Sequence, residues 1–134
     1  MKILLIKFRN IGDVLLSTPL VNNLRHHYPS AKIDFCINKE TEAMLTLNPN
    51  LNEIYTYDRV NVKSLNSISR IREEVRFICF FKKQKYDIVI NLTNGDRGNL
   101  IAWWAKSPIR IGCLNKNWFF RKALTHQTPS QGLR

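Results

Sequence analysis

Short apolar runs alternate with amphipathic segments along the chain. Residues 2–6 (Lys-Ile-Leu-Leu-Ile) form a nearly continuous apolar run, which is typical of a strand buried on both faces of a parallel sheet. Further strands are expected at residues 32–37, 52–57, 86–92 and 109–112, and short helices at residues 41–47 and 97–105. Repeated strand and helix units predict an α/β fold: a Rossmann-like parallel sheet with helices on both faces.

Two longer helices are expected from the spacing of apolar side chains. The first runs from Asp13 to about Tyr28, before Pro29, because leucines recur at every fourth position. These leucines are Leu16, Leu20 and Leu24. The second helix follows Ser64 and carries an apolar stripe that is expected to face the core. The members of the stripe are Leu65, Ile68, Ile71, Val75 and Ile78.

The length and the end of the regular pattern predict the domain organisation. A chain of 134 residues with 44% hydrophobic content supports one compact domain, which we expect to span residues 1–113. The alternation ends after Gly112, so residues 114–134 are expected to be an irregular tail or the start of a connection to a further domain. Adjacent aromatic residues at 118–120 are costly to expose, and we expect them to pack on the sheet or against such a domain.

The chain is strongly basic. Its 21 Lys and Arg residues outnumber 10 Asp and Glu residues, giving a formal net charge of +11. This charge favours anionic partners such as nucleic acid, phosphorylated sugars or an anionic membrane surface. The basic residues are scattered along the chain, which weakens the case for a disordered nucleic-acid-binding tail.

Cysteine usage and the amino-terminal segment point to the cytoplasm. Cys36, Cys79 and Cys113 lie singly within apolar runs, so buried, reduced thiols are expected instead of zinc ligands or a disulfide framework. Lys7 and Arg9 interrupt the first apolar run, so no signal peptide is expected, and no segment approaches a membrane span. Any membrane contact is therefore expected to be peripheral, at the inner face of the cytoplasmic membrane.

The loop after the first strand carries the candidate chemistry. In open parallel sheets, ligands bind beyond the carboxyl ends of the strands. Here Gly12 allows close approach of a ligand and Asp13 follows it. The Asp13 carboxylate has two interpretations, the N-cap of the first helix and a general base that takes a proton from a bound hydroxyl. The glycine patterns of dinucleotide and phosphate loops are absent, so a nucleotide held in those ways is not expected.

Several motifs of the chain match one family. The most specific is the segment 11–19 (Ile-Gly-Asp-Val-Leu-Leu-Ser-Thr-Pro), which follows the strand at 2–6. The weaker matches are Tyr28-Pro29, Asn48-Pro49, residues 86–93 and Arg110-Ile111-Gly112. With these motifs the sequence resembles, over nearly its whole length, the lipopolysaccharide heptosyltransferases of glycosyltransferase family 9. Residues 86–93 and 124–126 are most similar to the branch that adds the third, side-chain heptose.

The resemblance implies a GT-B architecture in which two Rossmann-like domains face each other. This chain is then the N-terminal half, which binds the acceptor, and the domain that binds the ADP-heptose donor lies outside it. On the family's pattern, Asp13 deprotonates a hydroxyl of the lipopolysaccharide inner core, which attacks the anomeric carbon of the donor with inversion. The scheme requires no metal and no further cofactor, and the chain alone is expected to be inactive.

An inner-core acceptor carries carboxylates and often phosphates, which suits the positive charge of the chain. The candidate acceptor-binding residues lie near the expected carboxyl ends of strands. They are Lys7, Arg9, Asn10, Gly12, Arg59, Lys63 and Arg97. Each charged member also has the simpler interpretation of a solvated surface charge. Arg9 and Asn10 depart from the small, serine-like residues common in relatives, which leaves the identity of the acceptor open.

Other interpretations stay open beside the enzyme. The chain is alternatively a basic nucleic-acid-binding module or a non-catalytic Rossmann-like protein, although no helix-turn-helix, zinc finger or aromatic RNA-binding motif is evident. Trp103 and Trp104 are expected to be core or interface anchors, with a sugar-stacking platform as the alternative.

Overall fold

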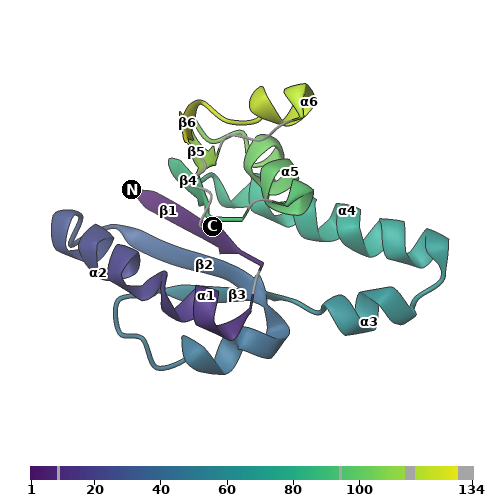
Figure 1. The fold of residues 1–134 in the computed structure, drawn as a ribbon, viewed down its shortest axis with the longest axis horizontal. Helices are drawn as coiled ribbons and strands as arrows, with labels where there is room; N and C mark the ends of the chain where they lie inside the picture. Colours follow the sequence, from purple (N-terminus) through teal and green to yellow (C-terminus); the bar gives the residue numbers. More distant parts are fainter. Residues whose placement is uncertain (9, 94, 114–116, 130–134) are drawn as a thin grey trace.

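The chain folds into a six-stranded parallel sheet with helices on both faces (Figure 1). The computed structural model describes residues 1–8, 10–93, 95–113 and 117–129. The strands are β1 (Lys2–Lys7), β2 (Lys32–Asn38), β3 (Glu53–Tyr57), β4 (Ile88–Asn91), β5 (Ile109–Cys113) and β6 (His126–Thr128), in the order β3-β2-β1-β4-β5-β6. The helices are α1 (Ile11–Leu15), α2 (Thr18–His27), the 3-10 helix η1 (Lys39–Met44), α3 (Arg59–Ser64), α4 (Ser67–Gln84), α5 (Asp96–Trp104) and α6 (Trp118–Arg121). The predicted Rossmann-like parallel fold is confirmed.

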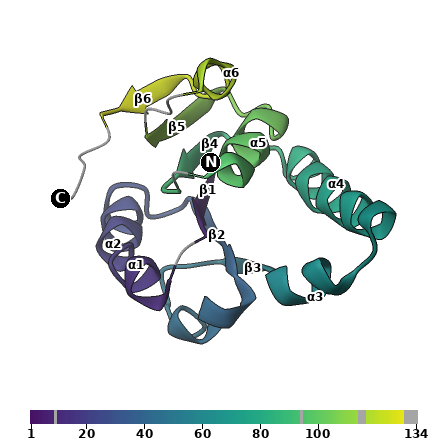
Figure 2. The same ribbon diagram turned by 45° about the vertical axis from the view of Figure 1, so that its right-hand side comes forward.

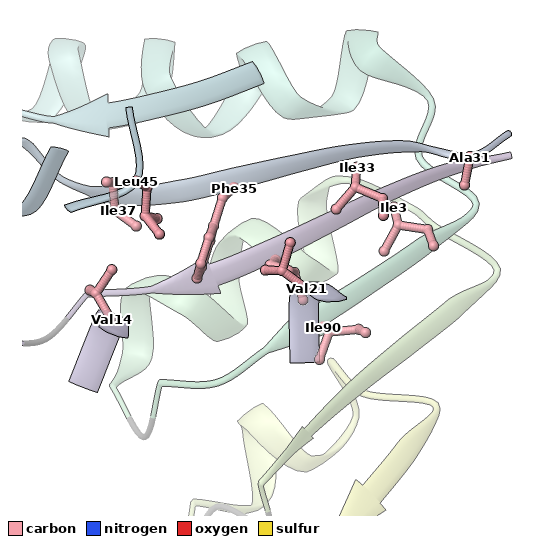
Figure 3. Close-up of a cluster of buried hydrophobic side chains, with 10 residues drawn as sticks. Ile3, Val14, Val21, Ala31, Ile33, Phe35, Ile37, Leu45 and Ile90 are labelled. Atoms are coloured by element: carbon pink, nitrogen blue, oxygen red, sulfur yellow. The ribbon is translucent and has the colours of Figure 1, made fainter. Parts of the chain in front are cut away.

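The side chains of β1 divide the core into two clusters, because successive residues of a strand point to opposite faces of the sheet. Ile3 and Leu5 pack in one cluster with Val14 of α1 and Val21 of α2 (Figure 3). Leu4 and Ile6 pack in the other, against α4 and α5. The helices α4 and α5 lie across the sheet from α1 and α2 in Figure 2. Helices therefore cover both faces, as predicted.

The strand register decides where loops gather. Lys7 at the end of β1 pairs with Ile37 of β2, and Asn38 at the end of β2 pairs with Tyr57 of β3. Because all pairs are parallel, the loops after β1, β2, β3 and β4 leave the sheet at one edge. The first loop and its neighbours thus surround one region of the surface.

The segment predicted as one helix over residues 13–28 forms two helices, α1 and α2. Pro19 lies in the first turn of α2. A proline there is tolerated, but it lacks the amide hydrogen that would continue α1. After this break the apolar face changes, so that Leu16, predicted to point inward, is largely exposed while Val14 and Val21 are fully buried.

Helix α4 buries a different face from the one predicted. Ile68, Ile71 and Val75 are between 52% and 80% exposed, while Leu65 and Ile78 are half-buried. Phe81 is fully buried instead, and Phe77 packs against the same cluster. Phenyl rings bury more apolar area than aliphatic side chains do, so the aromatic face of this amphipathic helix turns to the sheet. The predicted core stripe is therefore wrong for Ile68, Ile71 and Val75.

The described part of the carboxyl-terminal segment belongs to the sheet. β6 pairs in parallel with β5, and α6 precedes it (Figure 2). Leu124 is buried and packs so closely on Gly112 that a Cβ there would lie 2.9 Å from a Leu124 methyl carbon. An irregular tail over residues 114–134 is thus the wrong description of the helix and strand at residues 118–128, whose short apolar run is Ala123-Leu124. The prediction of a further domain after it stays a prediction.

The three cysteines Cys36, Cys79 and Cys113 are free thiols. Cys36 lies in the core, and burial raises its pKa far above the ordinary value. Cys79 and Cys113 are only half-buried, so the expectation of buried thiols holds for Cys36 alone. None of the helices in the described ranges is long and apolar enough to cross a membrane.

Candidate functional site

Two hollows open beside the edge of the sheet where the first four strands end. The first hollow, of about 500 Å³, is lined by Asn10, Ile11, Gly12, Asn38, Glu40, Thr41 and Arg59. The second hollow, of about 420 Å³, is lined by Phe8, Tyr57, Arg59, Val62, Lys63, Arg70, Glu74, Thr93, Gly95, Asp96 and Arg97. Arg59 lines both, so the two hollows adjoin.

Asp13 is the third residue of α1 and is half-buried. The N-cap of α1 is Asn10, so the interpretation of Asp13 as the cap is wrong. Within the described part of the chain, the Asp13 carboxylate accepts no hydrogen bond, while its main-chain carbonyl accepts one from the Ser17 hydroxyl at 2.9 Å. A carboxylate outside any cap stays free to take a proton from a ligand.

Asp13 lies directly after three residues that line the first hollow, Asn10, Ile11 and Gly12, although it is not itself among the lining residues. A Cβ added at Gly12 would meet nothing within 4 Å. The backbone at Gly12 is therefore open to a ligand, which is what the glycine was expected to allow. The catalytic role of Asp13 stays a prediction.

The first hollow has a polar lining suited to hydroxyl groups. Asn38 at the end of β2 has a buried side-chain oxygen with no hydrogen-bond partner among the described residues. The Thr41 hydroxyl donates to the Asn38 carbonyl at 2.8 Å, and Glu40 and Arg59 add one charge of each sign. Amides, hydroxyls and carboxylates together supply both donors and acceptors, as a sugar ligand needs.

The sequence did not single out Asn38, Glu40 or Thr41. They follow the second strand in the same way that Asn10 and Gly12 follow the first, and parallel neighbours end at the same edge. Their position directly after a parallel strand is the signal in the sequence that would have identified them.

The second hollow gathers positive charge. It brings together Arg59, Lys63 and Arg97, which the sequence predicted, and adds Arg70. The Asp58 carboxylate caps α3 by accepting a hydrogen bond of 3.0 Å from the Asn61 main-chain amide. This bond fixes the start of the helix that carries Arg59 and Lys63. That hydrogen bond, followed by one from Lys39, holds the pKa of the Asp58 carboxyl below its ordinary value. Arg59 and Lys63 are exposed and suited to bind an anionic group.

Arg97 is the exception in this group, because it is already paired. Its Nη2 lies 2.7 Å and its Nε 3.2 Å from the two carboxylate oxygens of Glu74, and its guanidinium carbon lies 4.1 Å from the centre of the Tyr57 ring. The Tyr57 hydroxyl donates a short hydrogen bond to Glu74. Arg97 is thus neither a free acceptor cation nor a solvated surface charge; it holds the wall of the second hollow.

Titration of this group follows from its contacts. Burial raises the pKa of the Glu74 carboxyl, but the hydrogen bonds from Arg97 and Tyr57 outweigh it, so the pKa is lower than usual. Burial and the hydrogen bond to Glu74 raise the pKa of Tyr57 to about 12. Glu74 is therefore ionised and Tyr57 neutral near pH 7.

Lys7 lines neither of the two hollows. The half-buried Lys7 ammonium donates to the Leu92 carbonyl at 2.8 Å, which ties the end of β1 to the loop after β4. Arg9 lies outside the described residues. For metals, no group of three or more His, Cys, Asp or Glu that could hold an ion occurs in the described parts of the chain.

Comparison with known proteins agrees with this geometry. No family model matches the chain. Lipopolysaccharide heptosyltransferase 3 of Escherichia coli strain K12 is 30% identical over 124 residues, which are 90% of this chain and 35% of that protein. A solved glycosyltransferase of family 9 from Veillonella parvula DSM 2008 is 33% identical, with a TM-score of 0.77, over 95% of this chain and 35% of that chain. The resemblance to the heptosyltransferases of family 9 is confirmed.

A third structure shows the shared fold at low identity. The E. coli heptosyltransferase WaaC, solved with ADP-2-deoxy-2-fluoro heptose, superposes with a TM-score of 0.81 at 15% identity, over the whole of this chain and 44% of that chain. The chain spans about a third of the length of the curated relatives it matches.

Proposed function

We propose that the chain is the N-terminal, acceptor-binding part of an inverting glycosyltransferase of GT-B architecture. The reaction moves a heptose from ADP-heptose to a hydroxyl of the lipopolysaccharide inner core. The observation that carries the proposal is the position of Asp13. It lies in the first turn of α1, directly after three residues that line the first hollow, and the first hollow shares Arg59 with the second, basic one.

In this proposal the Asp13 carboxylate is the general base. It removes the proton of the acceptor hydroxyl as the hydroxyl oxygen attacks the anomeric carbon and ADP leaves with the bonding electron pair. Gly12 leaves room for the acceptor beside the start of α1, and Asn10 binds it. Neither a metal nor a cofactor is part of the proposal.

The acceptor's anionic groups are received by the second hollow. Arg59 and Lys63 bind carboxylate or phosphate groups directly, while Arg97, paired with Glu74, positions the wall. The ADP-heptose donor binds mainly residues outside this chain. The protein works at the inner face of the cytoplasmic membrane, with peripheral contact, because its acceptor is attached to lipid.

The test is a rate measurement on the full-length protein with Asp13→Asn. With ADP-heptose and an inner-core acceptor, kcat is expected to fall by about 10²–10⁴-fold, since that is the usual contribution of a general base. KM for the donor is expected to stay within a few fold, because the side chain keeps its size.

A matched control is Glu53→Gln. Glu53 is an exposed carboxylate at the amino end of β3, on the opposite edge of the sheet, and its removal is expected to leave kcat unchanged. If the Asp13→Asn enzyme retains kcat within a few fold of wild type, Asp13 is not the base.

A further inference from the structure

Four large aromatic side chains are exposed at one place on the surface. They are Trp103 and Trp104 at the end of α5 and Trp118 and Phe119 in α6, and they are between 36% and 67% exposed. Ring contacts join three of them, because the Trp103 ring lies 5.4 Å from that of Trp104 and 6.3 Å from that of Phe119. Trp118 belongs to the same surface because it lines one hollow together with Trp103 and Phe119. We call these four residues the aromatic patch. Helices α5 and α6 lie next to each other in Figure 2.

The surroundings of the aromatic patch are basic. The Lys122 ammonium lies 4.3 Å from the centre of the Trp118 ring, and the Lys82 ammonium 5.7 Å from that of Trp104. Two hollows border the patch, and among the described residues their lining contains Lys82, Lys106, Arg110 and Lys122 and no acidic side chain. Exposed indole and phenyl rings beside lysines are typical of surfaces that enter the headgroup region of a membrane.

A sugar ligand suits this patch poorly. Its apolar hollow, of about 210 Å³, is lined by three of the patch rings, Leu100, Phe120 and Ala123, and its polar lining residues are Asn99 and Lys122. Asn99 is buried, and its side-chain oxygen accepts a hydrogen bond from Asn91 at 2.7 Å. Sugar hydroxyls would therefore find rings but few partners for their hydrogen bonds. The sugar-stacking alternative for Trp103 is disfavoured.

We propose that the aromatic patch is a docking surface for an anionic lipid bilayer. The rings of Trp118 and Phe119 enter the interface between headgroups and acyl chains, and Lys82, Lys106 and Lys122 contact lipid phosphates. This inference deepens the proposed function, because it names the surface through which an enzyme with a lipid-linked acceptor meets the membrane. The positive charge of these three lysines favours an anionic bilayer over an uncharged one.

The test is binding of the full-length protein to vesicles. We expect it to sediment with vesicles containing phosphatidylglycerol and not with vesicles of phosphatidylcholine alone. In the double variant Trp118→Ser, Phe119→Ser the affinity for anionic vesicles is expected to fall at least tenfold. Brominated acyl chains are expected to quench tryptophan emission in the wild type more than in a Trp118→Phe variant.

A matched control removes apolar surface elsewhere. Ile68→Ser with Val75→Ser, on the exposed face of α4, takes away aliphatic side chains and is expected to keep vesicle binding within twofold. Equal loss in this control overturns the proposal, and so does wild-type affinity in the patch variant. The proposal is also overturned if light scattering shows that the wild type is a dimer and the patch variant a monomer, because the patch is then an interface between two copies of the chain.

Two measurements keep the test decisive. Should the ring variant fail to fold by circular dichroism, Lys82→Gln with Lys122→Gln keeps the rings, and its expected loss of anionic-lipid binding is severalfold; unchanged binding overturns the proposal. Turnover of a soluble acceptor without acyl chains is expected to be the same in the patch variant and the wild type. If the wild-type protein turns over the soluble acceptor but does not bind anionic vesicles, the docking surface alone is refuted. If it binds these vesicles and Asp13→Asn keeps the wild-type kcat, the proposed base alone is refuted.

Discussion

The Tyr86 hydroxyl donates a hydrogen bond of 2.6 Å to Asp34 Oδ2 inside the core. Asp34 lies on β2 and is fully buried, and Tyr86 precedes β4, two strands away in the sheet. The other carboxylate oxygen, Oδ1, has no partner among the described residues. This bond is therefore the main polar compensation for burying a carboxyl group beneath the sheet.

Replacing Tyr86 with Phe is expected to destabilise the fold by about 1–3 kcal/mol, because it leaves a buried acceptor without its donor. Urea unfolding at pH 7 measures the change. Tyr28→Phe is the control, since Tyr28 is exposed at the end of α2 and its hydroxyl loss is expected to cost less than about 0.5 kcal/mol. Equal stability of the Tyr86 and Tyr28 variants would contradict the prediction.

Replacing Asp34 with Asn is expected to change how stability depends on pH. Burial raises the pKa of Asp34 above its ordinary 3.8, and the hydrogen bond from Tyr86 offsets this only in part. The folded protein therefore holds this proton more tightly than the unfolded chain, so the linked stability is present below about pH 3.8 and is lost as pH rises through the folded-state pKa. The amide of the Asp34→Asn variant does not titrate, so the variant does not lose this stability as pH rises. Relative to wild type, the free energy of unfolding of the variant is thus expected to increase from about pH 3 to pH 7. Denaturant titrations at several pH values measure this difference. If the difference between variant and wild type does not change with pH, the prediction is refuted.

Replacing Glu74 with Gln is expected to lower stability at pH 7 by about 1–2 kcal/mol, because Arg97 loses its counter-ion in a partly screened position. The sign of the pH dependence is opposite to that of Asp34. The pKa of Glu74 is lowered in the fold, so its contribution is present above its ordinary 4.5 and is lost as pH falls through the folded-state pKa. The difference between wild type and variant should therefore shrink in acid. Glu73→Gln is the control, because Glu73 pairs with the exposed Arg76 at 3.4 Å and is expected to contribute under about 0.5 kcal/mol.

Replacing Gly98 with Ala is expected to destabilise the fold by about 2–3 kcal/mol through overpacking. A Cβ at Gly98 would overlap the side-chain oxygen of Asn91 and lie 2.9 Å from its Cγ. Asn91 is buried and bonded to Asn99 and to the Thr93 amide, so it cannot move without breaking these bonds. Gly12→Ala is the matched control: it meets no atom, and alanine favours a helix, so thermal unfolding should show an unchanged or slightly higher Tm. A Gly98→Ala protein as stable as Gly12→Ala would exclude the overlap.

Much of the sheet was predictable from local pattern. The strands lie close to where apolar runs predicted them, at β1, β2, β3, β4 and β5, because a strand covered on both faces must be apolar over consecutive residues. The short β6 carries no such run, since all three of its residues are exposed, and the sequence missed it. The break at Pro19 was present in the sequence but was outweighed by the leucine spacing.

The candidate site was predictable only as far as the first loop. Asn10 and Gly12 line a hollow, and their binding of an acceptor stays a prediction, whereas Arg97 is paired with Glu74, 23 residues earlier on another helix. A pairing across such a distance depends on which face of α4 turns inward. That face was predicted wrongly, because Phe77 and Phe81 packed on the sheet in place of Ile71 and Val75.

The sequence by itself determined the class of fold, the order of most elements, the positive charge and the loop that carries Asp13, because these depend on residue type and short-range spacing. Only the tertiary structure decided which face of each helix is buried, which cations are paired and that Trp103 and Trp118 line one hollow. Those outcomes depend on competition between distant side chains for the same sheet and on charges that meet only after packing, and neither is encoded in the spacing of any single segment.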